Sequence, residues 1–126
     1  MKNNPVSWFE IYVSDMPRAK AFYEAVFAVE LSHLPAPTDD GLEMWAFPME
    51  MGLPGAGGTL AKMQGVEPGG GGTLIYLECD DVAVEAARIE AAGGKLHCGK
   101  QPIGEYGFMA IGIDTEGNTF GMHSMK

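Results

Sequence analysis

Three residues in the sequence combine a reactive side chain with a position inside an apolar segment: Glu10, Glu78 and His123. A carboxylate beside aromatic residues has its pKa raised towards that of a general base, so the three could form an acid–base group. Two carboxylates and one imidazole are also a familiar set of metal ligands. Alternatively, both glutamates are solvated or hydrogen-bonded to Tyr12 and Tyr76. The residue types alone leave these three interpretations open.

Other reactive residues lack the partners that would complete a site. Cys79 and Cys98 form no C-x-x-C pair, and we expect two free thiols. His97 and Cys98 could be half of a zinc site, but the sequence offers no second pair of ligands at a suitable spacing. No Ser or Cys nucleophile with a matched histidine emerges. The glycine runs 55–58 and 69–72 match neither the phosphate loop nor the dinucleotide pattern. Surface positions are expected for His33 and His97, whereas Lys62 or Lys100 could anchor an anionic ligand or be solvated.

Length and charge exclude several classes of protein. The chain has 126 residues and a net charge of −9, with glycine at 18 positions. One domain is typical of this length. So acidic a chain does not attract phosphate backbones or anionic lipid, so we expect no nucleic-acid partner and no membrane. No apolar run approaches the roughly 20 residues that span a bilayer, and no secretory signal is visible. The expected location is the cytoplasm.

The elements that must position these residues occur in a duplicated order. Strand composition at 6–13 precedes a helix that Asp15 caps and Pro17 enters, with apolar residues at helical spacing up to Phe27. Strands are predicted at 30–35, 42–49 and 59–64, followed by a glycine-rich linker at 65–72. The order then repeats, with a strand at 73–79, a helix from Asp81 to Gly93, and strands at 95–101, 106–114 and 118–123. A glycine hairpin turn at 114–118 joins the last two strands.

This order resembles the vicinal-oxygen-chelate superfamily of glyoxalases, bleomycin-resistance proteins and extradiol dioxygenases. The most specific segments are VSDMPRAKAFYEAVF (13–27), GGTLAKM (57–63) and GEYGFMAIGIDTEGNTFGMHS (104–124). The last is similar to proteins related to lactoylglutathione lyase. The resemblance implies one α+β domain over residues 1–126, with βαβββ modules at about 5–64 and 73–124. Their strands would form a curled, cup-shaped mixed sheet with the helices outside, and such proteins usually pair as homodimers.

The resemblance also places a divalent metal in the cup, held by the first and last strand of each module. The matching positions are Trp8, Ala61, Leu74 and Gly121. None of these side chains carries an N, O or S donor that could hold the ion. A register one residue later puts Phe9, Lys62, Ile75 and Met122 there, which also cannot form a divalent site. We therefore expect neither metal nor cofactor.

Alternation along the strands then predicts what lines the cavity. Phe9, Ile11 and Val13 would pack against the helix of the first module, and Ile75, Leu77 and Cys79 against that of the second. The predicted cavity residues are Trp8, Glu10, Tyr12, Ala61, Met63, Leu74, Tyr76, Glu78, Gly121 and His123. This lining favours a small apolar or aromatic ligand. The alternatives are a lyase- or isomerase-type enzyme using Glu10, Glu78 or His123, and a non-catalytic regulatory or interaction domain.

Overall fold

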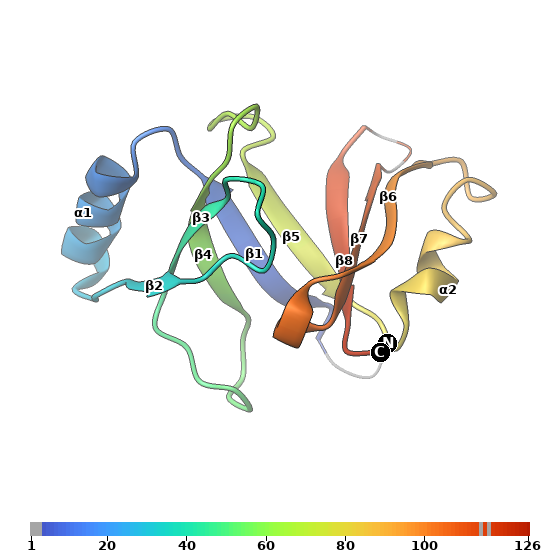
Figure 1. Cartoon of the computed structure of the whole chain (residues 1–126), viewed down its shortest axis with the longest axis horizontal. Coiled ribbons are helices and arrows are strands. Elements are labelled where there is room, and N and C mark those ends of the chain that lie inside the picture. Colours follow the sequence, from blue (N-terminus) through green and yellow to red (C-terminus); the bar gives the residue numbers. More distant parts are fainter. Residues whose placement is uncertain (1–3, 114, 116) are drawn as a thin grey trace. The chain divides into compact units, whose positions relative to one another are not determined.

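The computed structural model describes residues 4–113, 115 and 117–126 and divides the chain into two compact units. We call residues 8–73 the N-terminal unit. Residues 4–7 together with the described part of 74–126 form the C-terminal unit. Within the described residues each unit has one α-helix and four strands. The expected α+β class is therefore confirmed (Figure 1). None of the helices in the described ranges is long and apolar enough to cross a membrane.

The N-terminal unit carries a half-sheet of strand order β2-β3-β4-β1. Its elements are β1 (Val6–Tyr12), α1 (Met16–Phe27), β2 (Ser32–Leu34), β3 (Glu43–Ala46) and β4 (Gly57–Lys62). The pair β1/β4 is parallel, whereas β3/β4 and β2/β3 are antiparallel. As predicted, Asp15 caps α1, because its Oδ1 accepts the Arg18 N–H at 3.0 Å. The core of the N-terminal unit contains Val13, Met16, Leu31 and Leu60, with Ile11 packed against them.

The C-terminal unit repeats this plan with strand order β5-β8-β7-β6. Its elements are β5 (Thr73–Glu78), α2 (Val82–Ala86), β6 (Lys95–Pro102), the 3-10 turn η1 (Gly104–Tyr106), β7 (Phe108–Ile113) and β8 (Thr119–Ser124). The pair β5/β8 is parallel and the other two are antiparallel. Asp81 caps α2 through the Ala83 N–H at 3.0 Å. The core is built on Val82, Ala86, Ala110 and Met122.

Several predicted elements differ from those observed. The helix after Asp81 ends at Ala86, because the N–H groups of Arg88 and Ile89 donate to carbonyls three residues back. The strand predicted from 106 begins only at Phe108, since Gly104 and Gly107 have φ of 65° and 97° and form a turn. The two short strands at 30–35 and 42–49 shrink to Ser32–Leu34 and Glu43–Ala46. Positions 114 and 116 of the predicted hairpin turn lie outside the described residues.

The half-sheets are open, since neither pairs its first strand with its last among the described residues. The cup-shaped enclosure implied by the resemblance is therefore not seen within either unit.

The β1 strand crosses the unit boundary, because residues 6 and 7 belong to the C-terminal unit and residues 8–12 to the N-terminal unit. The Pro5 carbonyl accepts the Glu78 N–H at 2.9 Å, and the Ser7 hydroxyl lies 3.5 Å from the Tyr76 carbonyl.

Candidate functional site

Two sheet faces carry the predicted cavity residues, one in each unit. In the N-terminal unit the register places Trp8, Glu10 and Tyr12 beside Gly57, Thr59 and Ala61. Paired residues of neighbouring strands point to the same face. Because Ile11, Val13 and Leu60 pack with α1, this set occupies the opposite face. The predicted alternation along the first strand is therefore confirmed.

A buried polar pair lies on this N-terminal face. The Tyr12 hydroxyl donates to Glu10 Oε1 at 2.6 Å, and the two side chains are in the buried part of the unit. Of the interpretations open for Glu10, hydrogen bonding to Tyr12 is the one observed. The neighbouring residues on this face are also buried and mostly apolar, namely Met44, Ala46, Thr59 and Ala61.

In the C-terminal unit, Glu78 and His123 are brought side by side. They are register partners on the parallel strands β5 and β8, as are Tyr76 and Gly121. The imidazole Nε2 of His123 lies 2.6 Å from the Tyr106 carbonyl. A carbonyl can only accept, so Nε2 carries the proton, and in the neutral ring Nδ1 keeps the lone pair. The structure therefore provides a carboxylate next to an imidazole of fixed tautomer.

A pocket of about 350 Å³ opens beside this pair at the ends of β5 and β8. It is lined by Glu78, Cys79, Asp80, His123, Ser124, Met125 and Lys126. Burial is the main reason that the pKa of the Cys79 thiol is raised to about 11, and a hydrogen bond with Glu85 adds to the rise. The thiol is thus protonated near neutral pH, which does not favour a nucleophilic role.

The Tyr76 ring fills the position next to Gly121. An ideal Cβ placed on Gly121 would lie 2.4 Å from Tyr76 Cδ1 and 2.6 Å from Cε1. Any side chain at position 121, metal-ligating or not, would therefore collide with the ring. The described residues also contain no group of three His, Cys, Asp or Glu side chains that could hold a metal ion. The residues present do not fit the metal that the resemblance implies.

Reasoning from sequence missed several residues on these faces. Met109 and Ile111 of β7 pair with His123 and Gly121, and so extend the C-terminal face. Alternation within 106–114 could have found them once the hairpin register was known. The Tyr106 carbonyl could not have been found, because that residue was expected in a strand. Ile75 is a correction: it was expected to pack inward, but 40% of its surface is exposed.

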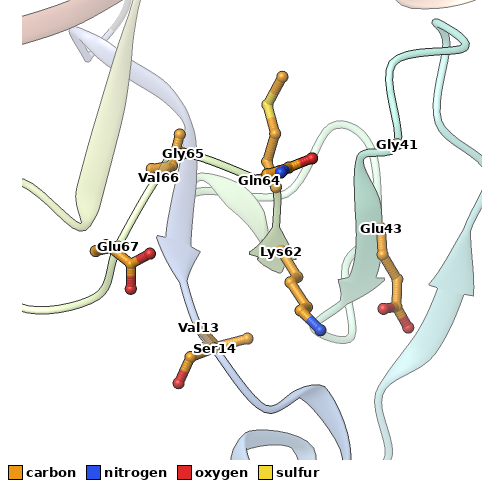
Figure 2. Close-up of a pocket in the computed structure, with 10 residues that line it drawn as sticks. Val13, Ser14, Gly41, Glu43, Lys62, Gln64, Gly65, Val66 and Glu67 are labelled. Carbon is orange, nitrogen blue, oxygen red and sulfur yellow. The ribbon is translucent and has the colours of Figure 1, made fainter.

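The remaining reactive residues are spread over the surface. His33 and His97 are exposed, as predicted, and both cysteines are free. Lys100 binds Asp81 at 2.9 Å, whereas Lys62 forms no ion pair within the described ranges. Lys62 borders a separate pocket of about 430 Å³ in the N-terminal unit, with Glu43, Gln64 and Glu67 around it (Figure 2). This second pocket contains Met63 but none of the other predicted cavity residues.

Comparison with known proteins agrees with this architecture. A structure of a hypothetical protein from Bacillus halodurans matches with a TM-score of 0.73 at 12% identity, covering 100% of this chain and 96% of that chain. A variant of methylmalonyl-CoA epimerase from Streptomyces coelicolor, in complex with 2-nitronate-propionyl-CoA, matches with a TM-score of 0.69 at 16% identity. That match covers 98% of this chain and 95% of that chain. The methylmalonyl-CoA epimerase from Mycobacterium tuberculosis matches with a TM-score of 0.67 at 14% identity, covering 97% of this chain and 88% of that chain.

At these identities the structural matches show the fold alone. No functionally curated protein matches the sequence. The model of the Glyoxalase/Bleomycin resistance protein/Dioxygenase superfamily matches residues 6–122. With almost the whole sequence matched and both βαβββ units observed, the chain belongs to this superfamily.

Proposed function

We propose that this protein is a small-molecule-binding member of the superfamily that works without the metal centre. The observation that carries the proposal is the Tyr76 ring packed over Gly121, which puts an aromatic side chain where a last-strand ligand would project. The other three expected ligand positions also carry side chains that cannot coordinate a metal ion, namely Trp8, Ala61 and Leu74. An aromatic and aliphatic surface favours an apolar or aromatic ligand over an ion.

The C-terminal face supports this proposal in detail. Tyr76, Met109 and Ile111 supply apolar surface on one side of the half-sheet. Glu78 and His123 supply two polar groups at its end, next to the pocket of about 350 Å³. A mostly apolar surface with a few convergent polar groups is the usual form of a small-molecule site. We propose that the ligand's ring lies on Tyr76 and that its polar end faces Glu78 and His123.

Metal analysis followed by a thermal-shift screen tests this function. We expect purified protein without a stoichiometric divalent ion, and a melting temperature that chelator leaves unchanged. Small aromatic compounds should raise that temperature, because binding to the folded state stabilises it by mass action. Tyr76→Leu should reduce the shift, whereas the control Lys62→Gln, in the pocket of Figure 2, should not. A tightly held divalent ion bound in stoichiometric amount would overturn the proposal.

A second candidate function is proton transfer on a small carbonyl compound. The observation that favours it is the fixed tautomer of His123, whose Nδ1 could accept a proton while the ring is held by the Tyr106 carbonyl. A C–H bond next to the carbonyl would break, Nδ1 of His123 would take the proton, and the resulting enolate would regain a proton from the imidazolium so formed, with the Glu78 carboxylate beside it to stabilise that cation. The structural relatives include proteins named as epimerases, which fits chemistry of this class.

Exchange of substrate protons with deuterated solvent distinguishes the two functions. An enzyme should exchange the proton next to the carbonyl, and Glu78→Gln or His123→Gln should slow this by about a hundredfold or more. A simple binder should hold the compound without exchange. If Glu10→Gln, Glu78→Gln and His123→Gln all exchange at the parental rate, acid–base catalysis by these residues is excluded.

A further inference from the structure

A buried hydroxyl without a partner lies on the N-terminal face. Thr59 has no exposed surface, and its Oγ1 is the buried side-chain atom of the described residues that lacks a hydrogen-bond partner. Leaving such a hydroxyl unmatched is costly, because it has given up its hydrogen bonds to water. Valine has the same shape and would suit the apolar neighbours Met44, Ala46 and Ala61 better. The hydroxyl therefore calls for an explanation beyond packing.

The position of Thr59 points to a ligand. It is the register partner of Glu10, so its side chain lies on the same face as the Glu10–Tyr12 pair, one strand spacing away. Glu10 is 6% exposed, so a carboxylate and an unmatched hydroxyl are buried next to each other. In the C-terminal unit the register counterpart of Thr59 is Gly121, because Gly121 pairs with Tyr76 of β5 as Thr59 pairs with Glu10 of β1. The hydroxyl is thus particular to the N-terminal unit.

We propose that Thr59 and Glu10 form a polar subsite for an uncharged ligand group that carries an acceptor and a donor side by side, such as a carboxamide. The Thr59 hydroxyl would donate to the carbonyl oxygen, and the Glu10 carboxylate would accept from the NH₂ group while Tyr12 holds Oε1. A carboxylate ligand is repelled by Glu10. An ammonium ligand has no acceptor for the Thr59 proton. This subsite goes beyond the proposed function, because it lies in the N-terminal unit and would take a polar group of its own, separate from the one that faces Glu78 and His123.

The neighbouring register pair offers a route to this subsite. Trp8 pairs with Gly57, one pair along the strands from Glu10 and Thr59 on the same face. Around Gly57, an ideal Cβ would lie 2.6 Å from Met49 Sδ and 3.3 Å from Trp8 Cζ3. Met49 belongs to the exposed loop 48–56, where Met51 is 98% exposed. A methionine thioether is flexible and polarizable, so displacement of Met49 would admit an aromatic ring beside Trp8.

Substitution of Thr59 tests the subsite with three probes of one size: benzamide, benzoate and benzylamine. At pH 7 benzamide should raise the melting temperature of the parent protein more than either charged probe does. Without any probe, Thr59→Val should melt about 3 °C or more above the parent, because an unmatched hydroxyl has been removed. The same variant should bind benzamide about fivefold to tenfold more weakly. Thr59→Ser, which keeps the hydroxyl, should retain the preference for benzamide.

Each contrary result has a distinct meaning. If Thr59→Val melts at or below the parental temperature, the hydroxyl has a partner such as an internal water, and the subsite is overturned. The subsite is also overturned if Thr59→Val is stabilised but binds benzamide as tightly as the parent. If the three probes raise the parental melting temperature equally, aromatic binding survives and the amide preference does not. If none of them shifts it, the subsite is overturned, whereas the function proposed for the C-terminal face is judged by its own screen with Tyr76→Leu.

Discussion

Replacing Gly121 by alanine tests the packing that excludes a metal ligand. The added Cβ would meet Tyr76 Cδ1 at 2.4 Å, whereas ordinary contact begins at 3.4 Å, so the ring must move by about 1 Å. Overpacking of this kind costs about 1–3 kcal/mol. Loss of glycine's flexibility in the unfolded chain returns about 0.5–1 kcal/mol. We therefore expect Gly121→Ala to be destabilised by roughly 0.5–2 kcal/mol, a fall of about 2–8 °C in melting temperature.

Urea unfolding of a double-mutant cycle with Tyr76→Ala isolates the contact. In the Tyr76→Ala background the collision is gone, so Gly121→Ala should be neutral or slightly stabilising. The coupling energy should then be about 1–3 kcal/mol. Gly99→Ala in β6 is a matched control, because the nearest atom to its added Cβ is Leu96 Cδ2 at 3.9 Å. A collision between position 121 and the Tyr76 ring is refuted if Gly121→Ala is as stable as Gly99→Ala, or loses the same free energy in the Tyr76→Ala background.

Three further predictions concern titrating groups. The Cys79 thiol, with its pKa raised to about 11 by burial and Glu85, should react slowly with iodoacetamide at pH 8 and fast near pH 11, and Glu85→Gln should shift this profile to lower pH. The Lys100 ammonium lowers the pKa of Asp81, so the Asp81 contribution to stability is present above about pH 4 and is lost in acid. Asp81→Asn should melt above Asp81→Ala, since asparagine still caps α2. The Leu31 amide is the main cause of the lowered pKa of Glu24, so Glu24→Ala should speed hydrogen exchange at that amide.

Contrary outcomes of these three tests are equally definite. The thiol's raised pKa means that its contribution to stability is present below about pH 9 and falls as the pH rises towards 11. Alkylation at pH 8 as fast as in the unfolded chain would contradict it. If Asp81→Asn and Asp81→Ala have the same melting temperature across pH 2–7, capping of α2 by the residue 81 side chain does not contribute to stability. Lys20→Ala should affect the Leu31 amide less than Glu24→Ala does, and the reverse order would contradict the contact with the backbone.

Local patterns predicted the half of the site that depends on neighbours in sequence. Alternation separated Ile11 and Val13 from Glu10 and Tyr12, and the caps at Asp15 and Asp81 were placed correctly, because side-chain direction and capping are set within a few residues.

Tertiary contacts decided the rest. The Tyr106 carbonyl reaches His123 only because a 3-10 turn precedes β7, and the missing partner of Thr59 depends on what surrounds it in three dimensions. The exposure of Ile75 could not be predicted from alternation either. Alternation predicts which face of the sheet a side chain is on, but not whether other residues pack over that face.

The crossing of the unit boundary by β1 bears on any attempt to express the repeats separately. The C-terminal unit takes residues 4–7 from the start of the chain and the rest from its second half. A fragment cut in the linker 65–72 would leave the Glu78 N–H without the Pro5 carbonyl. Such a half should fold poorly by itself and be rescued by a peptide that supplies Pro5, Val6 and Ser7.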